Sequence, residues 1–385
     1  MKTYLKKVAV FSALACMLSL QAIPAGAYWE DNIYYEIWGD EAVVSRFRET
    51  ERKPMVDLVI PSELGGYPVT FLNGVSIGKM PNLVSVSIPD TVTRIGTDVF
   101  YECPKLETVH IPDSVTTIQG GAFRDCPNLL ELDIPASVTQ IGACAFENTG
   151  WMNARLEESP LVTVNHILIN GRTCTENPVL SEDIHIISQN AFAGNQEITS
   201  VEFSNQVTEI KRHAFEQCSN LKEIVLPESV TSIEYDAFRE CTNLESITIE
   251  NPYCRIEHYN YYYDGFVISN GYDIYDDGSN LEMLHNIPYY HGVIRGYENS
   301  TAQAYAEQCG YQFESIGIAL KAGDADSSGE VDILDIISLN KAVMGTETLT
   351  PEQLRAIDFN NNGKPDADEA LTLLKYVVGL ISSPV

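Results

Sequence analysis

The sequence predicts two structural parts, a long solenoid of short parallel β-strands and, after it, a small all-helical domain. Three observations support this prediction. A 23-residue pattern recurs along the middle of the chain, phenylalanines keep one phase of that period, and two twelve-residue acidic loops near the C-terminus each precede an apolar helical segment. A fixed period of this length is typical of a solenoid, whose units bury their apolar faces only by stacking on one another.

The first segment of the chain has the composition of an export signal. Lysines within the first seven residues precede an apolar run from Val8 to about Ile23, which leads to small residues at 25–27. This order is typical of a secretory signal peptide, so we expect residues 1–27 to be removed and residues 28–54 to form an N-terminal cap. The apolar run is too short for a confident membrane span, and no later run is long enough. The sequence therefore predicts a secreted, extracellular protein without a membrane span.

The charge of the chain argues against one class of partner. The full sequence has 24 basic and 54 acidic residues, a formal net charge of −30. Loss of Lys2, Lys6 and Lys7 with the leader leaves 21 basic residues and a net charge of about −33. Such a surface repels phosphate backbones, so we do not expect nucleic-acid binding.

The repeats are most regular in two stretches of the chain. The irregular stretch between them, 152–197, is two periods long, so the register survives it. The aligned units are 83–105, 106–128, 129–151, 198–220 and 221–243, and the phenylalanines in phase are Phe100, Phe123, Phe146, Phe192, Phe215 and Phe238.

The unit 106–128 shows how each coil should fold. Alternating apolar residues predict a short strand, and Pro112 ends it because proline cannot donate to a continued ladder. A second apolar pair predicts another inward wall, and the phenylalanine should fill the far corner. The inward residues of this unit are expected to be Leu106, Val109, Ile111, Val115, Ile118 and Phe123.

These units resemble the BspA-like leucine-rich repeats, with the motif I-P-x-S-V-T-x-I followed by A-F and a cysteine. The resemblance covers about 55–318 and implies leucine-rich repeat coils over 55–250, beginning with an atypical coil that has Ile77 and Met80 at the Phe and Cys positions. Residues 251–318, which are rich in tyrosine, resemble a terminal cap that shields the last coil, with a short helix and a closing strand between Gly296 and Phe313.

Four of the eight cysteines outside the leader share one repeat position: Cys103, Cys126, Cys218 and Cys241. Repeat phase accounts for their location, so we predict buried free thiols in a ladder. A disulfide between neighbouring coils, such as Cys103 with Cys126, is the alternative. The other four are out of phase and their state is open: Cys144, Cys174, Cys254 and Cys309.

Two twelve-residue loops begin at Asp324 and Asp358. Each has side-chain oxygens at positions 1, 3, 5, 9 and 12 and a glycine at position 6, a spacing that surrounds a hard cation with oxygen ligands. We therefore predict two Ca²⁺ ions. The first would be bound by Asp324, Asp326, Ser328, Asp332, Asp335 and the carbonyl of Glu330, the second by Asp358, Asn360, Asn362, Asp366, Glu369 and the carbonyl of Lys364. The alternative, two acidic turns that cap helices, explains only one aspartate in each loop.

Each loop is followed by an apolar helical segment that ends at a glycine, and Thr350–Gln353 predicts a capped helix before the second loop only. This order resembles a type I-like dockerin over about 321–381, and we assign 319–323 to the linker and 324–381 to the domain. Two departures from the family are Ser328, a weaker ligand at position 5, and Pro365, which lacks the N–H that paired loops usually donate.

The dockerin resemblance implies a cohesin domain of a cellulosome scaffold as partner. Helical spacing predicts an inward stripe in each helix, Ile336, Leu339 and Val343 in the first and Ala370, Leu373 and Val377 in the second. The residues on the other faces are candidates for partner binding, with the first helix preferred: Ile333, Leu334, Ile337, Lys341, Ala367, Asp368, Leu371 and Lys375. A wider core packed within the domain is the alternative.

The sequence offers little support for catalysis. No nucleophile and base occur at a spacing typical of a catalytic pair. His110 and Asp133 share one strand position in adjacent coils, and we interpret them as ordinary solvated residues. The exposed strand positions are small or acidic and lack aromatic platforms for sugars, so the Tyr-rich cap is the better candidate for a glycan, with cap packing as the alternative.

We therefore predict a secreted non-catalytic interaction protein that docks onto a cellulosome and presents its repeats to a protein or a plant cell-wall glycan. The first alternative is a polysaccharide-degrading enzymatic subunit with an unrecognised glycoside-active site. A surface adhesin, suggested by family analogy alone, is a third reading.

Overall fold

The computed structural model describes residues 27–30, 32–48, 55–74, 79–257, 267–275, 285–318, 320–360 and 362–384. The chain divides after Glu157 into two compact units, which are described one at a time. The expected leader lies outside the described residues, as do Ile77 and part of the Tyr-rich segment. Within the described ranges, no helix is long and apolar enough to cross a membrane.

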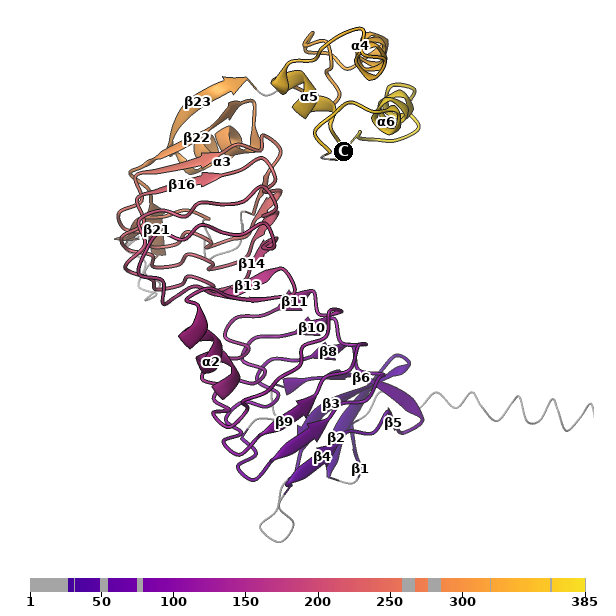
Figure 1. The fold of residues 1–385 in the computed structure, drawn as a ribbon, viewed down its shortest axis with the longest axis vertical. Coiled ribbons are helices and arrows are strands. Elements are labelled where there is room, and N and C mark those ends of the chain that lie inside the picture. The colour runs from indigo at the N-terminus through magenta and orange to yellow at the C-terminus, as the bar shows by residue number, and fades with distance from the viewer. Residues whose placement is uncertain are drawn as a thin grey trace, which may run out of the picture. The chain divides into compact units, whose positions relative to one another are not determined.

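The first unit begins with an antiparallel sheet that continues into parallel coils (Figure 1). Strands β1, β2 and β3 pair antiparallel, and β3, β6, β8, β10 and β11 then follow in parallel, while β4, β7 and β9 form a second parallel sheet. The element bounds are β1 Ala27–Glu30, β2 Ile33–Trp38, β3 Glu41–Phe47, β4 Asp57–Val59, β5 Glu63–Leu64, β6 Tyr67–Leu72, β7 Ser85–Ser87, β8 Arg94–Ile95, β9 Thr108–His110, β10 Thr117–Ile118, β11 Gln140–Ile141 and α2 Gly150–Glu158.

The second unit contains the remaining coils, their cap and the C-terminal helical domain. One sheet runs in the order β12, β13, β14, β15, β17, β19, and another in the order β16, β18, β22, β23. The bounds are β12 Val162–Val164, β13 Ile167–Asn170, β14 Ile186–Ile187, β15 Glu209–Ile210, β16 Glu223–Leu226, β17 Ser232–Ile233, β18 Ser246–Ile249, β19 Arg255–Ile256, β20 Gly271–Tyr275, β21 His285–Tyr289, β22 Val293–Glu298, α3 Thr301–Cys309, β23 Gln312–Ile318, α4 Ile333–Val343, α5 Pro351–Ile357 and α6 Ala367–Val377.

The strand pairing confirms the predicted period. Thr117 pairs in parallel with Arg94 and Gln140, each 23 positions away, and Ser232 pairs with Glu209 and Arg255 in the same way. The solenoid is therefore built from coils whose strands lie one above another. The predicted short helix and closing strand at the end of the array are also present. They are α3, with Ser300 as its N-cap, and β23, which pairs in parallel with β22.

The phenylalanines form stacked columns in the core. All six predicted residues are buried. Phe215 lies between Phe192 and Phe238, with ring centroids 4.9 and 5.1 Å away and planes within 7° of parallel. In the first unit, Phe123 stacks on Phe100 and Phe146 at 5.5 and 5.8 Å. Burial of each ring contributes about 1.5–3 kcal/mol, and the stacked rings fill the space between successive coils.

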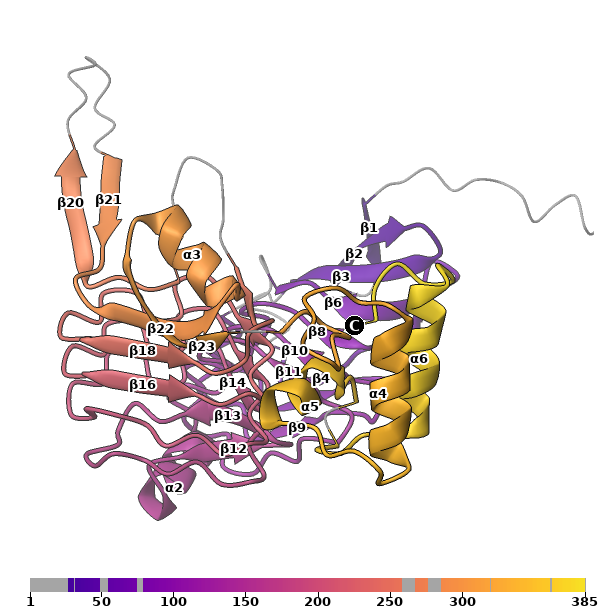
Figure 2. The same cartoon turned by 90° about the horizontal axis from the view of Figure 1, so that it is seen from above.

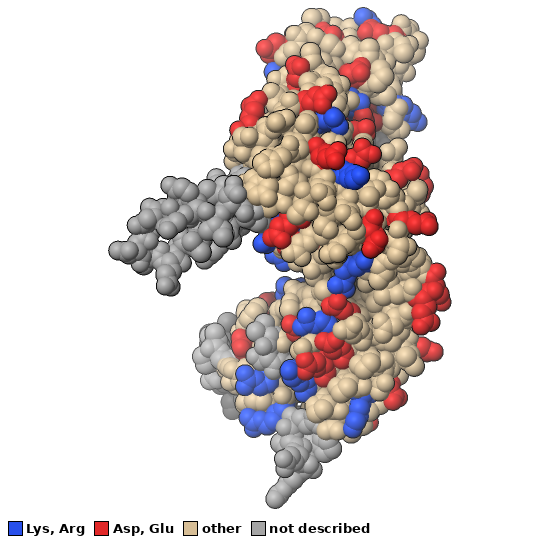
Figure 3. Space-filling view, turned by 90° about the vertical axis from the view of Figure 1, so that its left-hand side faces the viewer, with Lys and Arg blue, Asp and Glu red and all other residues tan. Residues whose placement is uncertain are grey.

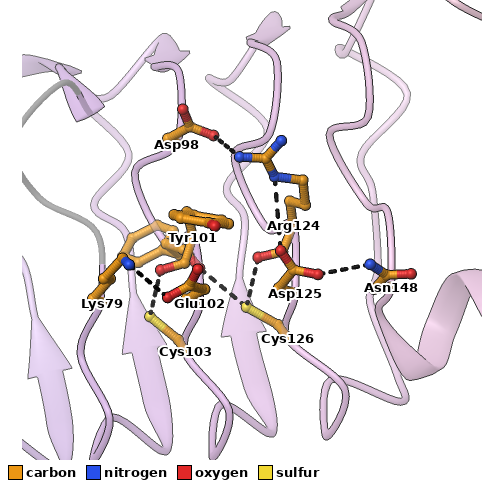
Figure 4. Close-up of polar contacts among 10 residues, drawn as sticks. Lys79, Asp98, Tyr101, Glu102, Cys103, Arg124, Asp125, Cys126 and Asn148 are labelled. Carbon is orange, nitrogen blue, oxygen red and sulfur yellow. Dashed lines mark hydrogen bonds and ion pairs between the residues drawn. The ribbon is translucent and has the colours of Figure 1, made fainter.

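Polar contacts repeat along the corners of the first unit (Figure 4). Lys79 forms an ion pair with Glu102 at 2.9 Å, and the guanidinium of Arg124 lies 4.4 Å from the ring centroid of Tyr101. Asn148 donates to Asp125 at 2.7 Å. These side chains are partly or fully exposed, so each contact contributes little by itself, and their joint effect is to hold neighbouring coils in register.

Cysteines form the expected ladder beside the phenylalanines. None of the eight described cysteines forms a disulfide, and the four in phase are fully buried. The thiol of Cys126 donates to the carbonyl of Phe100 at 3.0 Å, and Cys218 and Cys241 donate in the same way to Phe192 and Phe215. Burial raises the pKa of Cys218 to about 12. The buried thiols are therefore small core residues rather than nucleophiles.

A thiol titration tests this ladder. Denatured, unreduced protein should show eight free thiols for each chain without its leader, and never fewer than the four of the ladder. The folded protein should react mainly at Cys144 and Cys309, which are only half-buried. If the denatured protein shows no free thiol, the cysteines are paired and the ladder is wrong.

The structure differs from the sequence predictions at three places. Helix α2 lies at the start of the irregular stretch, where we predicted no element. Val109 is half-buried rather than fully inward, because it borders a surface hollow. Val343 is 38% exposed, so its assignment to the inward stripe is wrong: it is the last residue of α4, and the core ends one turn earlier at Leu339.

Candidate functional site

The C-terminal domain places its two helices after two acidic loops. Asp332 caps α4 and accepts from the backbone N–H of Leu334 at 2.7 Å, and Asp366 caps α6 by the same arrangement. In both helices the carboxylate three residues later accepts a hydrogen bond from the backbone N–H of the cap residue. Loop position 12 therefore completes a capping box as well as serving as a candidate ligand.

The first loop turns three carboxylates toward one point. Asp324 is almost fully buried, and its oxygens accept from the N–H groups of Ser328 and Gly329, each at 2.9 Å. Asp335 is fully buried and accepts from the N–H of Asp326 at 3.1 Å. Oxygens of Asp324, Asp326 and Asp335 lie within 4.8 Å of one another. The structure therefore brings together three of the side chains predicted to bind the first ion.

Two further predicted ligands of the first loop lie next to each other. The hydroxyl of Ser328 donates to the carbonyl of Glu330 at 3.1 Å. Gly329, between them, has φ +87°, a left-handed conformation that glycine adopts without a steric penalty. This sharp turn is the one expected at loop position 6.

The second loop repeats this arrangement. Asp358 accepts from the N–H groups of Asn362 and Gly363 at 2.9 and 2.8 Å, as Asp324 does in the first loop. Asp366 accepts from the side-chain amides of Asn360 and Asn362 at 2.9 and 2.7 Å. Four of the predicted ligands thus lie within one hydrogen-bonded group.

Glu369 and Lys364 complete the second loop. Glu369 is 2% exposed, and one of its oxygens accepts from the N–H of Asp366 at 3.0 Å. Its other oxygen, Oε1, is buried without a hydrogen-bond partner among the described residues. The N–H of Lys364 donates to Asn362 at 3.0 Å, while the predicted ligand of this residue is its carbonyl. A buried carboxylate oxygen without a partner is rare in folded proteins and calls for a ligand.

Helices α4 and α6 lie side by side and enclose a small core (Figures 1 and 2). That core contains Ala325, Ile336, Leu339, Ile357, Ala370 and Leu373. Of the predicted inward stripe of α6, Val377 is only partly buried against this core. The remaining apolar residues of both helices lie outside it.

All eight residues proposed for partner binding are exposed. On α4, Ile333 and Leu334 are each 53% exposed and Ile337 is 45% exposed. On α6, Leu371 is 49% exposed, whereas the positions that match Ile333 and Leu334 are Ala367 and Asp368. The exposures argue against the alternative of a wider core within the domain, since these aliphatics do not pack inward.

The sequence reasoning omitted several exposed apolar residues of the same domain. They lie in the second half of α6 and at the helix ends: Met344, Leu374, Val378 and Leu380. The helical period places Leu374 and Val378 on one face of α6, four residues apart, and this spacing could have revealed them. The apolar surface of α6 is consequently larger than the sequence analysis proposed.

Comparison with family models now identifies both parts of the chain. Residues 76–168 and 169–267 match the BspA type leucine rich repeat region, with six copies, and residues 322–378 match the dockerin type I domain. The chain is a BspA-type leucine-rich repeat protein with a C-terminal type I dockerin. The family expectations for fold are thereby confirmed.

Solved leucine-rich repeat proteins are similar to this chain at low identity. A protein from Bacteroides ovatus is 21% identical over 78% of this chain and 69% of its own, with a TM-score of 0.33. The T. pallidum leucine rich repeat protein is 21% identical over 60% of this chain and 91% of its own, with a TM-score of 0.30. The pneumococcal vaccine antigen PcpA is 15% identical over 76% and 98%, with a TM-score of 0.32. No curated protein matches the sequence.

The electrostatics of the dockerin loops fit a bound cation. Burial raises the pKa of Glu369 to about 7, and the nearby carboxylates of Asp366 and Asp358 add to this. Burial likewise raises the pKa of Asp335, although backbone N–H groups oppose the shift. A divalent cation at each loop would favour the ionised carboxylates and give Glu369 Oε1 a partner. The residues present therefore fit Ca²⁺, whose preferred ligands are such oxygens.

Proposed function

We propose that this protein is a secreted, non-catalytic component of a cellulosome that docks onto a cohesin through its calcium-loaded dockerin. The observation that supports this most directly is the pair of loops with buried carboxylates, each followed by a helix with an exposed apolar face. Two Ca²⁺ ions, bound by the residues predicted above, would hold both helices in place. The repeats would then present a second surface to a protein or a cell-wall glycan.

We propose different roles for the two helices because equivalent loop positions carry different residue types in the two motifs. Loop positions 10 and 11 are Ile333 and Leu334 in the first motif but Ala367 and Asp368 in the second. Burying aliphatic residues stabilises an interface, whereas burying an unpaired carboxylate weakens it. We therefore propose that the first helix provides the preferred docking face.

Paired substitutions test this docking face. The double variant Ile333→Asp with Leu334→Asp should weaken cohesin binding by at least roughly tenfold, because the interface would bury two carboxylates in place of two aliphatics. Asp is well tolerated in the first turn of a helix, so the dockerin should still fold. Calorimetric titration of a cohesin in the presence of calcium measures the loss.

The matched control is the double variant Ala367→Asp with Leu371→Asp, which adds the same charge to α6. We expect a clearly smaller loss from this variant, and a smaller loss again from Ala367→Asp alone. Equal losses from the two helices would argue against docking through the first helix. Unchanged binding in both double variants would exclude these faces from the interface.

The alternative of an enzymatic cellulosome subunit makes a different prediction about the repeats. A glycoside-active site needs two carboxyl groups on opposite sides of a bound sugar. Incubation of the full chain with cell-wall polysaccharides, followed by a reducing-sugar assay, distinguishes the two proposals. We expect no release of sugar.

A further inference from the structure

A hollow of about 390 Å³ lies on the strand face of the second unit. Its lining includes Phe203, Val225 and Pro227 and three carboxylates, Glu202, Glu223 and Glu250. These residues come from three successive coils, since they fall in the units that begin at 198, 221 and 244. The hollow is therefore a product of coil stacking.

Among the described residues that line this hollow, the carboxylates have no cationic partner. No Lys or Arg lines it. Arg295, in the strand column of Val225, pairs with Glu314 at 2.9 Å. Arg355 pairs with Glu228, and its charge opposes the rise in the pKa of Glu250. Burial, with the nearby Glu228, raises the pKa of Glu250. On the face drawn in Figure 3, acidic side chains lie in separate groups, several of them beside lysines or arginines, with large uncharged areas between the groups.

An exposed aliphatic residue lies among these carboxylates. Val225 is 47% exposed at the outward position of β16. Val179 lies two coils before Val225 in the same column and is 66% exposed. In the coil between them, Glu202 pairs in parallel with Val179. Alternation of aliphatic and acidic side chains suits a ligand that is itself both aliphatic and cationic, because the stem of a lysine or arginine packs on apolar surface while its charge remains at the edge.

The first unit has a hollow in the same phase of the repeat. It measures about 410 Å³ and is lined by Asp90, Asp113 and Asp133, with His110 in the position of Val225. Within the described residues, the one group of at least three His, Cys, Asp or Glu side chains close enough to share a metal ion is Asp324, Asp326 and Asp335, so neither hollow contains such a group. The carboxylates of both hollows are more widely spaced, as expected for a larger cationic group.

We propose that the hollow around Val225 binds a basic segment of another polypeptide, with a lysine or arginine between Glu202, Glu223 and Glu250. The aliphatic stem of that residue packs on Val225 and Phe203, and its charge pairs with the carboxylates. This inference rests on the proposed role of the repeats as a binding surface and names the chemistry of the partner. Complementary charge is what selects a polypeptide of this kind over a neutral glycan.

Fluorescence anisotropy of the full-length protein with labelled peptides tests the proposal. The probes are a hexapeptide of alternating lysine and valine, its counterpart with glutamate in place of lysine, and hexalysine. Only the two basic probes should bind, and more weakly as salt is raised. The triple variant Glu202→Gln, Glu223→Gln and Glu250→Gln should lower the affinity for the lysine–valine probe by at least about tenfold.

A charge-matched triple variant provides the control. Glu176→Gln, Glu182→Gln and Glu197→Gln remove the same charge from exposed positions of the same unit, and the affinity should change by less than about twofold. Val225→Ser should weaken binding of the lysine–valine probe more than that of hexalysine. Equal losses from the two triple variants, or no binding of the basic probes, would overturn the proposal. Cohesin binding, measured on the same samples, should be unchanged in every variant. A loss of peptide binding at the hollow is therefore distinguishable from a loss of cohesin docking.

Discussion

Chelation of calcium should unfold the dockerin and leave the repeats folded. Asp324, Asp335 and Glu369 are at most 2% exposed. Without a cation, Asp324 and Asp335 are buried close together in the first loop, and Glu369 is buried near Asp358 and Asp366 in the second. The core that opposes this repulsion is small, with six buried residues. A ligand at a thousand times its dissociation constant stabilises the folded state by about 4 kcal/mol, which is a large share of the stability of a domain of this size.

Thermal unfolding followed by circular dichroism measures this effect. In calcium we expect a helical transition from residues 321–381, and in EDTA this transition should disappear or fall well below that of the repeats. The variant Asp324→Ala with Asp358→Ala should behave in calcium as the unmodified protein does in EDTA. An unchanged helical signal and an unchanged transition in EDTA would contradict the proposed calcium sites.

Replacement of Phe215 by alanine should destabilise the second unit by about 3–5 kcal/mol. The ring is fully buried and stacks on Phe192 and Phe238, and Phe203 contacts its edge at 6.2 Å between centroids. The truncation would leave a cavity in the middle of the column that the flanking coils, held by their own hydrogen bonds, fill only in part. Because each coil contacts only its neighbours, the loss should also reduce the cooperativity of unfolding.

Denaturant unfolding of the full chain measures this loss, with the loss of β-sheet signal as the readout. Phe203→Ala is the matched control, since this phenylalanine is only half-buried and lies outside the column, and we expect a clearly smaller loss. Phe215→Leu, which keeps most of the apolar volume, should also lose less than Phe215→Ala. If Phe215→Ala costs less than about 1 kcal/mol, the stacked column is not a main source of stability.

The loops and the core columns could be predicted from residue spacing because both are local or periodic. In the dockerin, the ligand series and the two capped helices lie within a few turns of each other along the chain. In the repeats, Phe192, Phe215 and Phe238 recur at one phase, and stacking coils must place equal phases in equal environments. The spacing therefore predicted the core without any knowledge of the tertiary contacts.

The corners of the coils could not be predicted in the same way. One corner position adopts a left-handed backbone in coil after coil, yet it is occupied by different residue types: Asp98, Gly121, Cys144, Asn190, His213 and Asp236. Apart from the glycine, each would lose about 1–2 kcal/mol there in isolation. Hydrogen bonds between coils hold the corner, as when the N–H of Asp98 donates to the carbonyl of Gly120 at 3.0 Å.

The sequence by itself determined the solenoid, its period, the phenylalanine and cysteine columns and the two oxygen-rich loops. Only the tertiary structure decided that Val343 is exposed, that α6 carries Leu374 and Val378 on its surface, and that Glu202, Glu223 and Glu250 surround one hollow. The physical reason is that a repeat pattern predicts which side chains face inward. Exposure at a helix end and the grouping of outward side chains depend instead on where the neighbouring helices and strands end.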